Sequence, residues 1–161
     1  MRARALCFLS LACLAWVLVA CDLLPRTRSD QLLAEIDKQE HKWLEKDVDS
    51  HRIVVSHVRS IWHAQMYDIL VSEGRVVEQS ASCIPAPAES GECQVESFDP
   101  EEYTVAGLFA VARLLAQRDK GDWTEIEFDP TYGYPLSIAY DHPDIVDEDT
   151  YWGVRSFEVN E

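Results

Sequence analysis

Residues 98–121 read FDPEEYTVAGLFAVARLLAQRDKG and carry the strongest structural signal in the chain. Asp99 can act as an N-cap, Pro100 suits the first helical position, and Glu102 can close a capping box. Gly121 stands where a left-handed C-cap is expected. Apolar residues follow the cap at spacings of three and four, which predicts one helix from Pro100 onward with a stripe that packs on a sheet. The apolar positions are Val105, Leu108, Phe109, Ala112, Leu115 and Ala116.

The segment before this helix predicts a first helix followed by strands. The helix is expected from residue 30 to about 48, with Ser29 or Asp30 as its cap, because apolar residues fall near one stripe among charged ones. Runs rich in β-branched residues then indicate strands at 53–58, 66–71 and 75–81. Between the last two, Ser72-Glu73-Gly74 is typical of a tight hairpin turn, since glycine readily adopts a positive φ.

Three short strands are expected after the helix, at 123–128, 136–140 and 152–159. The last changes its alternation between Val154 and Phe157, which indicates a β-bulge near Arg155. The connections have hairpin length, so we predict an α+β fold with an antiparallel sheet and two main helices packed on it. The expected order is α-β-β-β-α-β-β-β, in a single domain over residues 30–161.

Composition limits the partners. The chain has 161 residues and a formal net charge of -15, with 47% hydrophobic residues. That is enough for one domain with a modest core. The negative excess repels phosphates, so nucleic acid and anionic lipid headgroups are disfavoured as direct partners. It fits a solvated surface or a cationic partner.

The N-terminus has the features of a secretory signal. Arg2 and Arg4 precede an apolar run, 5–20, that is broken only by Ser10 and is short for a permanent spanning helix. The run ends in Leu18-Val19-Ala20-Cys21, which resembles the lipobox of bacterial lipoproteins. The alternatives are a plain secretory signal and an uncleaved anchor helix.

The lipobox resemblance implies removal of a signal peptide, 1–20, and attachment of diacylglycerol to the thiol of Cys21. The membrane is then a partner through the lipid, because two or three acyl chains hold a protein firmly on a bilayer. Residues 21–29 lack periodicity and are expected to form a tether. We therefore expect a cell-envelope protein, anchored on the non-cytoplasmic side of a membrane.

Five cysteines are present, and Cys7, Cys13 and Cys21 belong to the N-terminal region. The remaining pair, Cys83 and Cys93, is predicted to form a structural disulfide, since disulfides persist outside the cytoplasm. Redox or metal chemistry is the alternative. It is less favoured because the chain has no Cys-x-x-Cys motif and few additional ligands nearby.

Residues 128–135, FDPTYGYP, resemble the signature of a small family of bacterial lipoproteins catalogued as a domain of unknown function. The similarity extends over roughly 50–160, with a Gly-containing turn before the valines at 76–77 and a Tyr-Thr-Val helix start at 103–105. It implies the fold and the location of the family. The family has no assigned activity, so the resemblance implies no chemistry.

The motif also has an explanation from its residue types. Asp129 can bind backbone amides in a turn, Gly133 admits a positive φ, and Pro135 forces Tyr134 into an extended conformation. The segment therefore predicts a rigid loop between two strands. It is also our candidate contact loop for a ligand or partner, through Asp129, Tyr132, Gly133 and Tyr134, and both interpretations stay open.

Candidate chemistry is sparse. His51, His57 and His63 would share a face on one long strand, and the acidic segment 141–149 could offer oxygen ligands to a divalent cation. No nucleophile elbow, phosphate-binding Gly-rich loop or His-Glu-x-x-His motif occurs in the sequence. We therefore expect no cofactor and assign no catalytic or metal-ligating residue.

Two functional interpretations remain. The first is a non-catalytic binding or accessory domain, held by its lipid in the cell envelope, with an envelope protein or wall component as partner. The second is an envelope enzyme or a cation-dependent binder that uses the histidines and residues 141–149. The missing catalytic motifs favour the first interpretation.

Overall fold

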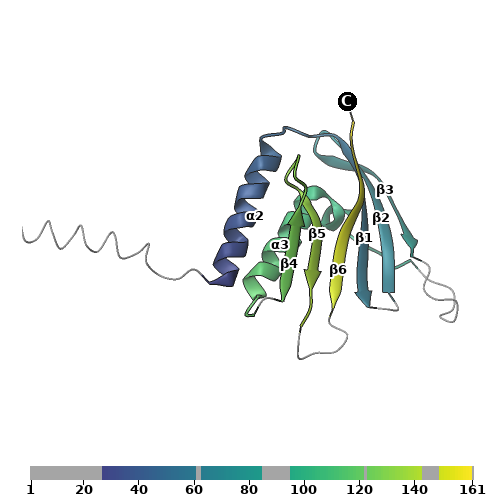
Figure 1. Cartoon of the computed structure of the whole chain (residues 1–161). Helices are drawn as coiled ribbons and strands as arrows, with labels where there is room; N and C mark the ends of the chain where they lie inside the picture. The colour runs from purple at the N-terminus through teal and green to yellow at the C-terminus, as the bar shows by residue number, and fades with distance from the viewer. Residues whose placement is uncertain (1–26, 61–62, 85–94, 122, 143–148, 161) are drawn as a thin grey trace, which may run out of the picture.

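A computed structural model describes residues 27–60, 63–84, 95–121, 123–142 and 149–160. These residues form two α-helices, a short 3-10 helix and the strands of one sheet (Figure 1). In chain order the elements are α2 (Arg28–Leu44), β1 (His51–Ser60), β2 (His63–Ser72), β3 (Arg75–Cys83), η2 (Pro100–Tyr103), α3 (Val105–Arg118), β4 (Thr124–Phe128), β5 (Pro135–Tyr140) and β6 (Thr150–Val159).

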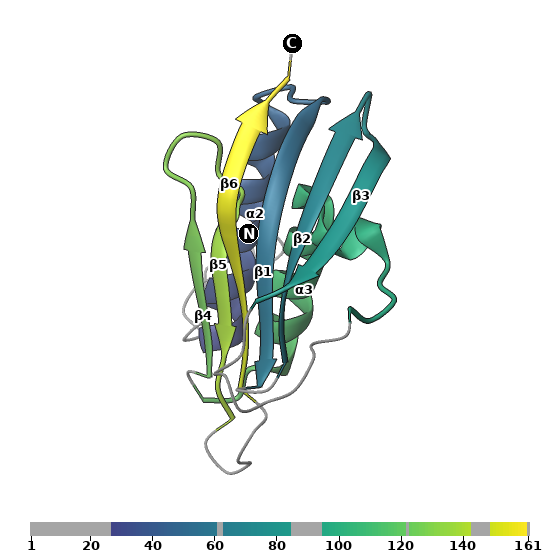
Figure 2. The ribbon, with the colours of Figure 1, turned by 90° about the vertical axis from the view of Figure 1, so that its right-hand side faces the viewer.

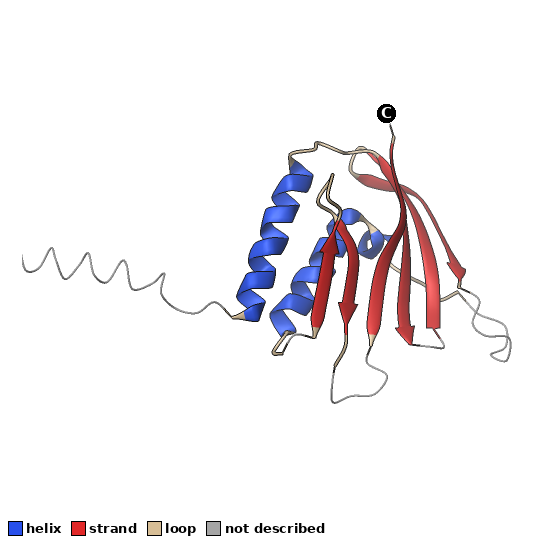
Figure 3. Ribbon diagram, in the orientation of Figure 1, coloured by secondary structure: helices blue, strands red, loops and turns tan. Residues whose placement is uncertain are grey.

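The sheet has six strands in the order β3-β2-β1-β6-β5-β4, and every pairing is antiparallel. Both α-helices cover the same face of the sheet, and the other face carries no helix among the described residues (Figures 2 and 3). The central pair joins the first strand to the last, from His51↔Val159 to Val58↔Tyr151. Two three-stranded meanders, each preceded by a helix, are thereby joined into one sheet.

The core lies between the helices and the covered face of the sheet. Alternate residues of β1 and β2 point into it, so Ile53, Val55, Tyr67 and Ile69 are all buried. The helices contribute a matching set of buried side chains. These are Ile36 from α2 and Val105, Leu108, Phe109, Ala112, Leu115 and Ala116 from α3.

Two predicted irregularities of the sheet are confirmed. Glu73 and Gly74 have φ values of 50° and 71° and join β2 to β3 in a two-residue turn. Positive φ at both positions gives the turn whose twist matches the flanking strands. In the β1–β6 pair, Val54 lies opposite Ser156 and Val55 opposite Val154. Arg155 is therefore the extra residue of a bulge.

The predicted element order is wrong, because the described chain runs α-β-β-β-η-α-β-β-β. Pro100 begins a 3-10 helix that ends at Tyr103, and α3 begins only at Val105. Asp99 caps the 3-10 helix, whereas Thr104 is extended (φ -76°, ψ 167°) and its hydroxyl accepts from the Gly107 N–H. An extended residue interrupts the helix, so the predicted single helix is two elements with separate caps.

The helix ends also differ from the predictions. α2 begins after Thr27, which shares a capping box with Asp30, and it ends at Leu44 rather than near residue 48. Glu45 caps this end, and the chain then turns at Asp47, which has a φ of 52°. α3 ends at Arg118 and its C-cap is Asp119, which is extended, so Gly121 is not its left-handed cap.

The carboxylate of Asp119 explains why the chain leaves α3 at this point. Burial acts to raise the pKa of Asp119, but the backbone N–H groups of Gly121, Trp123 and Thr124 donate to it and bring the pKa below its ordinary value. The chain therefore leaves α3 by wrapping around a buried carboxylate. None of the described helices is long and apolar enough to cross a membrane.

Because α3 starts at Val105, removing the cap of α3 at Thr104 should destabilise the fold more than removing the cap of η2 at Asp99. Thr104→Val removes a buried hydroxyl that bonds both Glu101 O and Gly107 N, so we expect a loss of about 1–2 kcal/mol in the free energy of unfolding. Asp99→Ala removes one exposed bond at the 3-10 helix and should cost about 0.5 kcal/mol or less. Urea denaturation followed by circular dichroism measures both. A larger loss for Asp99→Ala would contradict a helix start at Val105.

Candidate functional site

Two cavities lie on either side of η2 and the first turn of α3. A groove of about 650 Å³ runs along α3, and a smaller pocket of about 160 Å³ lies beside the end of α2. Both are bordered by Glu101, Thr104 and Ala106. The groove falls in the range of volumes that small-molecule sites occupy, whereas the pocket is smaller than that range.

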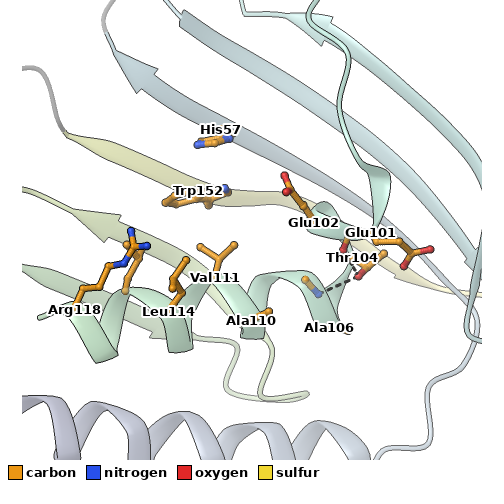
Figure 4. Close-up of a pocket in the computed structure, with 12 residues that line it drawn as sticks. His57, Glu101, Glu102, Thr104, Ala106, Ala110, Val111, Leu114, Arg118 and Trp152 are labelled. Atoms are coloured by element: carbon orange, nitrogen blue, oxygen red, sulfur yellow. Dashed lines mark hydrogen bonds between the residues drawn. The ribbon is translucent and has the colours of Figure 1, made fainter.

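The groove lies between one side of α3 and the sheet (Figure 4). The residues of α3 that line the groove recur every three or four positions, so they form one stripe along the helix and one wall of the groove. This stripe lies beside the stripe of α3 that faces the core. That wall consists of Ala106, Gly107, Ala110, Val111, Leu114, Leu115 and Arg118. Trp152 of β6 and His57 of β1 form the opposite wall. Leu114 on the helical wall is 46% exposed.

His57 is held in the wall by partners on both ring nitrogens. Nδ1 lies 3.1 Å from the hydroxyl of Tyr103, and Nε2 lies 3.1 Å from Oγ1 of Thr150. Its ring stacks on Trp152 with 4.2 Å between centroids. Burial, followed by the neighbouring Tyr67 hydroxyl, raises the pKa of Tyr103 well above its ordinary value. This network fixes the position and orientation of the imidazole in the wall of the groove.

The remaining polar groups of the groove are a capping hydroxyl and charges at its ends. Oγ1 of Thr104 donates to Glu101 O and accepts from Gly107 N, so it is occupied as a helix cap. Glu101 and Glu102 stand at the N-terminal end of the groove and Arg118 at the other. Among the described residues, the lining contains no cysteine or serine.

The small pocket contains a histidine without a partner. His51 is 4% exposed, and within the described chain neither of its ring nitrogens has a hydrogen-bond partner. It is enclosed by aromatic rings, with centroids of Trp43 at 5.6 Å and Phe157 at 5.3 Å. Burial lowers the pKa of His51 below 6.5, so the neutral imidazole is the stable form in the fold.

The structure brings the four residues of the predicted contact loop together, against α2. Oδ1 of Asp129 accepts from the backbone N–H groups of Thr131 and Tyr132, as the sequence predicted for a turn. Gly133 has a φ of 88° and approaches the carbonyl of Gln39 so closely that a Cβ there would lie 2.8 Å from that oxygen.

The two tyrosines of this loop join the aromatic cluster around His51. Tyr134 is 5% exposed, with ring centroids 4.6 Å from Phe157 and 6.3 Å from Trp43. The ring centroid of Tyr132 lies 5.4 Å from that of Phe157. These contacts account for the loop as a clamp that fixes α2 on the sheet, while a role in binding stays a prediction.

The other candidate residues do not form one site. His51 and His57 both lie on the covered face of β1, but His63 begins the next strand. No group of three potential metal ligands occurs in the part of the chain that the structure describes. Of the acidic segment, residues 143–148 lie outside the described residues, as does Cys21.

The predicted disulfide is described at one end only. Cys83 ends β3 and is disulfide-bonded. Cys93 lies outside the described residues, so the pairing of Cys83 with Cys93 stays a prediction.

The sequence analysis missed the groove, including Trp152, Arg118 and the glutamates at its far end. One signal was present. Ala106, Ala110 and Leu114 follow one another at intervals of four, so α3 is apolar on more than the stripe that faces the core. A helix with two apolar stripes needs a second contact for one of them.

Comparisons with known proteins give one result. Residues 35–159 match the model of a family described as "Family of unknown function (DUF6174)", which covers most of the chain and includes both cavities. Neither curated proteins nor solved structures give a match.

The neutral His51 predicts a specific pH dependence of stability. The unfolded chain protonates this histidine near pH 6.5, whereas the folded state holds it neutral, so the unfolded state binds more protons as the pH falls. The free energy of unfolding should therefore decrease below pH 6.5. His51→Phe should stabilise the fold by about 1–3 kcal/mol at neutral pH, since it removes an unpartnered buried polar group. The difference in free energy of unfolding between His51→Phe and the wild type should grow toward pH 5.

Urea midpoints at several pH values measure this effect. His41→Phe is the matched control, because His41 lies on the exposed surface of α2 with 74% of its side chain accessible. It should leave the slope of stability against pH close to that of the wild type. An equal gain from His51→Phe at pH 5 and pH 8 would contradict the account of His51.

Replacing Gly133 should lower the free energy of unfolding by more than its positive φ alone explains. Gly133→Ala places a Cβ against the α2 backbone at a positive φ, so we expect a loss of about 2–3 kcal/mol. Gly74→Ala is the matched control, because Gly74 also has a positive φ (71°) but a methyl group there would meet nothing within 4 Å. Thermal unfolding compares them, and equal losses would show that the contact with α2 contributes nothing.

Proposed function

We propose that this chain, which belongs to the DUF6174 family of unknown function, is a lipid-anchored protein of the cell envelope. Its folded domain then binds a ligand in the groove along α3 without catalysing a reaction. The proposal joins two independent lines of evidence, the N-terminal sequence and the geometry of the groove.

The anchor is supported by the order of features before Cys21. A positive start, a short apolar run, the small residue Ala20 and the cysteine follow one another as in a lipoprotein signal. The small residue lets a peptidase approach the bond before Cys21, and the thiol is the nucleophile that accepts the lipid. The compartment also fits the disulfide at Cys83, because disulfides persist outside the cytoplasm.

The binding role is supported by one observation above all, the state of the polar groups inside the groove. Both ring nitrogens of His57 and the hydroxyl of Thr104 are already hydrogen-bonded within the protein. A ligand in the groove can reach a ring nitrogen of His57 only by displacing Tyr103 or Thr150 from it. Groups that are already paired can line a binding surface at little cost, because a ligand need not satisfy them.

The apolar character of the groove explains what such a surface contributes. Val111, Leu114 and Trp152 stand open to it, and apolar area that leaves water drives association. Small-molecule sites are typically concave and lined mainly by apolar side chains. Binding in this groove is therefore the function that the geometry supports best.

The anchor predicts the outcome of substituting one cysteine. Cys21→Ala removes the thiol that takes the lipid, so the chain should stay unprocessed or leave the membrane fraction after a salt wash. Cys13→Ala, in the same apolar run, is the matched control and should be processed like the wild type. Labelling cells with a radioactive fatty acid and mass spectrometry of the N-terminal peptide measure the result. A wild-type N-terminus that begins at Met1, or that lacks diacylglycerol, would overturn the anchor.

A further inference from the structure

We propose that the groove along α3 holds the hydrocarbon chain of an anionic amphiphile, with the charged head beside Arg118. The ligand is an acyl chain with a negative head, drawn from the membrane to which the protein is tethered. This inference rests on the proposed lipid anchor and names the ligand class of the same site.

The shape of the groove favours a long and thin ligand. Its helical wall extends from Ala106 to Arg118, which is about 18 Å along the axis of α3. The short side chains of Ala106 and Ala110 leave space along this wall, while Val111, Leu114 and Trp152 supply apolar contacts. A hydrocarbon chain makes such contacts along its whole length and asks for no hydrogen bonds from the occupied groups of the wall.

The charges at the two ends give the ligand a direction. Arg118 is exposed and has neither an ion pair nor a hydrogen bond within the described ranges. By contrast, Arg113, five residues earlier on α3, is paired with Asp37 and Glu40. Glu101 and Glu102 stand at the far end, where they repel a negative head. The head therefore belongs at Arg118 and the hydrocarbon tail toward Ala106.

The unpaired arginine is informative because acids are in excess. The chain has 29 aspartates and glutamates against 14 lysines and arginines, so acidic partners are abundant. The negative surface as a whole disfavours contact with a sheet of anionic headgroups. A single head at Arg118 avoids that repulsion, because the guanidinium forms charge-assisted hydrogen bonds with a carboxylate or phosphate at one point.

The position of Arg118 relative to the tether places this end of the groove near the bilayer. Oγ of Ser29, in the first turn of α2, donates to the carbonyl of Ala116 at 2.7 Å. The start of α2 thus lies beside the C-terminal end of α3 (Figure 1). The eight residues from Cys21 to Ser29 can span at most about 28 Å. A lipid on Cys21 would thus hold the C-terminal end of α3 within that distance of the membrane, where an acyl chain can enter beside Arg118.

Photocrosslinking in vesicles tests the proposal on the processed lipoprotein. The protein is reconstituted in phosphatidylcholine vesicles that contain a photoreactive, alkyne-tagged fatty acid or, in a second arm, a phosphatidylglycerol with the same reactive chain. After irradiation, the tag reports total labelling and mass spectrometry locates it. We expect labelling in the tryptic peptide 114–118 or the peptide before it, which together contain the helical wall of the groove.

Two pairs of variants separate the groove from general contact with lipid. Ala110→Trp should reduce labelling by about tenfold, because the indole fills the groove. Gln117→Trp, exposed on α3 but outside the groove, should leave it unchanged. Arg118→Glu should also reduce labelling by about tenfold, since it replaces the attraction with repulsion. Lys120→Glu makes the same charge change outside the lining and should have little effect.

The outcomes separate this inference from the anchor. Labelling by either arm that depends on Ala110 and Arg118 supports the proposal, and the arm that labels better identifies a free fatty acid or a phospholipid as the source. Labelling that Ala110→Trp leaves unchanged, or the absence of labelling in both arms, overturns it. The N-terminal peptide of the same preparation reports lipidation of Cys21, so a failed groove and a failed anchor give different results.

Discussion

The stacking of Tyr103 on Tyr67, with 3.6 Å between ring centroids, fixes where α3 begins over the sheet. Tyr103 closes the 3-10 helix, Thr104 turns the chain, and α3 starts at the next residue. The same tyrosine bonds His57, so one side chain sets both the helical wall of the groove and its strand wall.

Local chemistry predicted the features that a few neighbouring residues decide. The turn at Gly74, the bulge at Arg155 and the amide-binding carboxylate of Asp129 follow from residue types and spacing alone. The start of α3 was mispredicted because Asp99-Pro100 can begin either a 3-10 helix or an α-helix. In the fold, Tyr103 ends the 3-10 helix and stacks on Tyr67 of a strand far away in the sequence, a contact that no local pattern contains.

The groove was not predictable from local sequence patterns either. Its walls come from β1, from η2 with α3, and from β6, and antiparallel pairing of the first strand with the last brings His57 and Trp152 together. The histidines were singled out from the sequence, but their environments were not predictable. His57 and His51 share one face of β1, yet the first bonds two hydroxyls and the second meets aromatic rings and has no partner among the described residues.

The motif loop holds α2 in place, and the groove leaves one side of α3 uncovered. Gly133 and Tyr134 press on α2 and its aromatic neighbours, so the loop holds α2 in place. α2 in turn covers one side of α3 through Arg113, which satisfies that side with ion pairs and leaves the side toward Trp152 uncovered. An apolar helix face that stays open on a strongly acidic domain carries a cost in water. That cost has a physical reason if the open face is where a hydrocarbon chain binds.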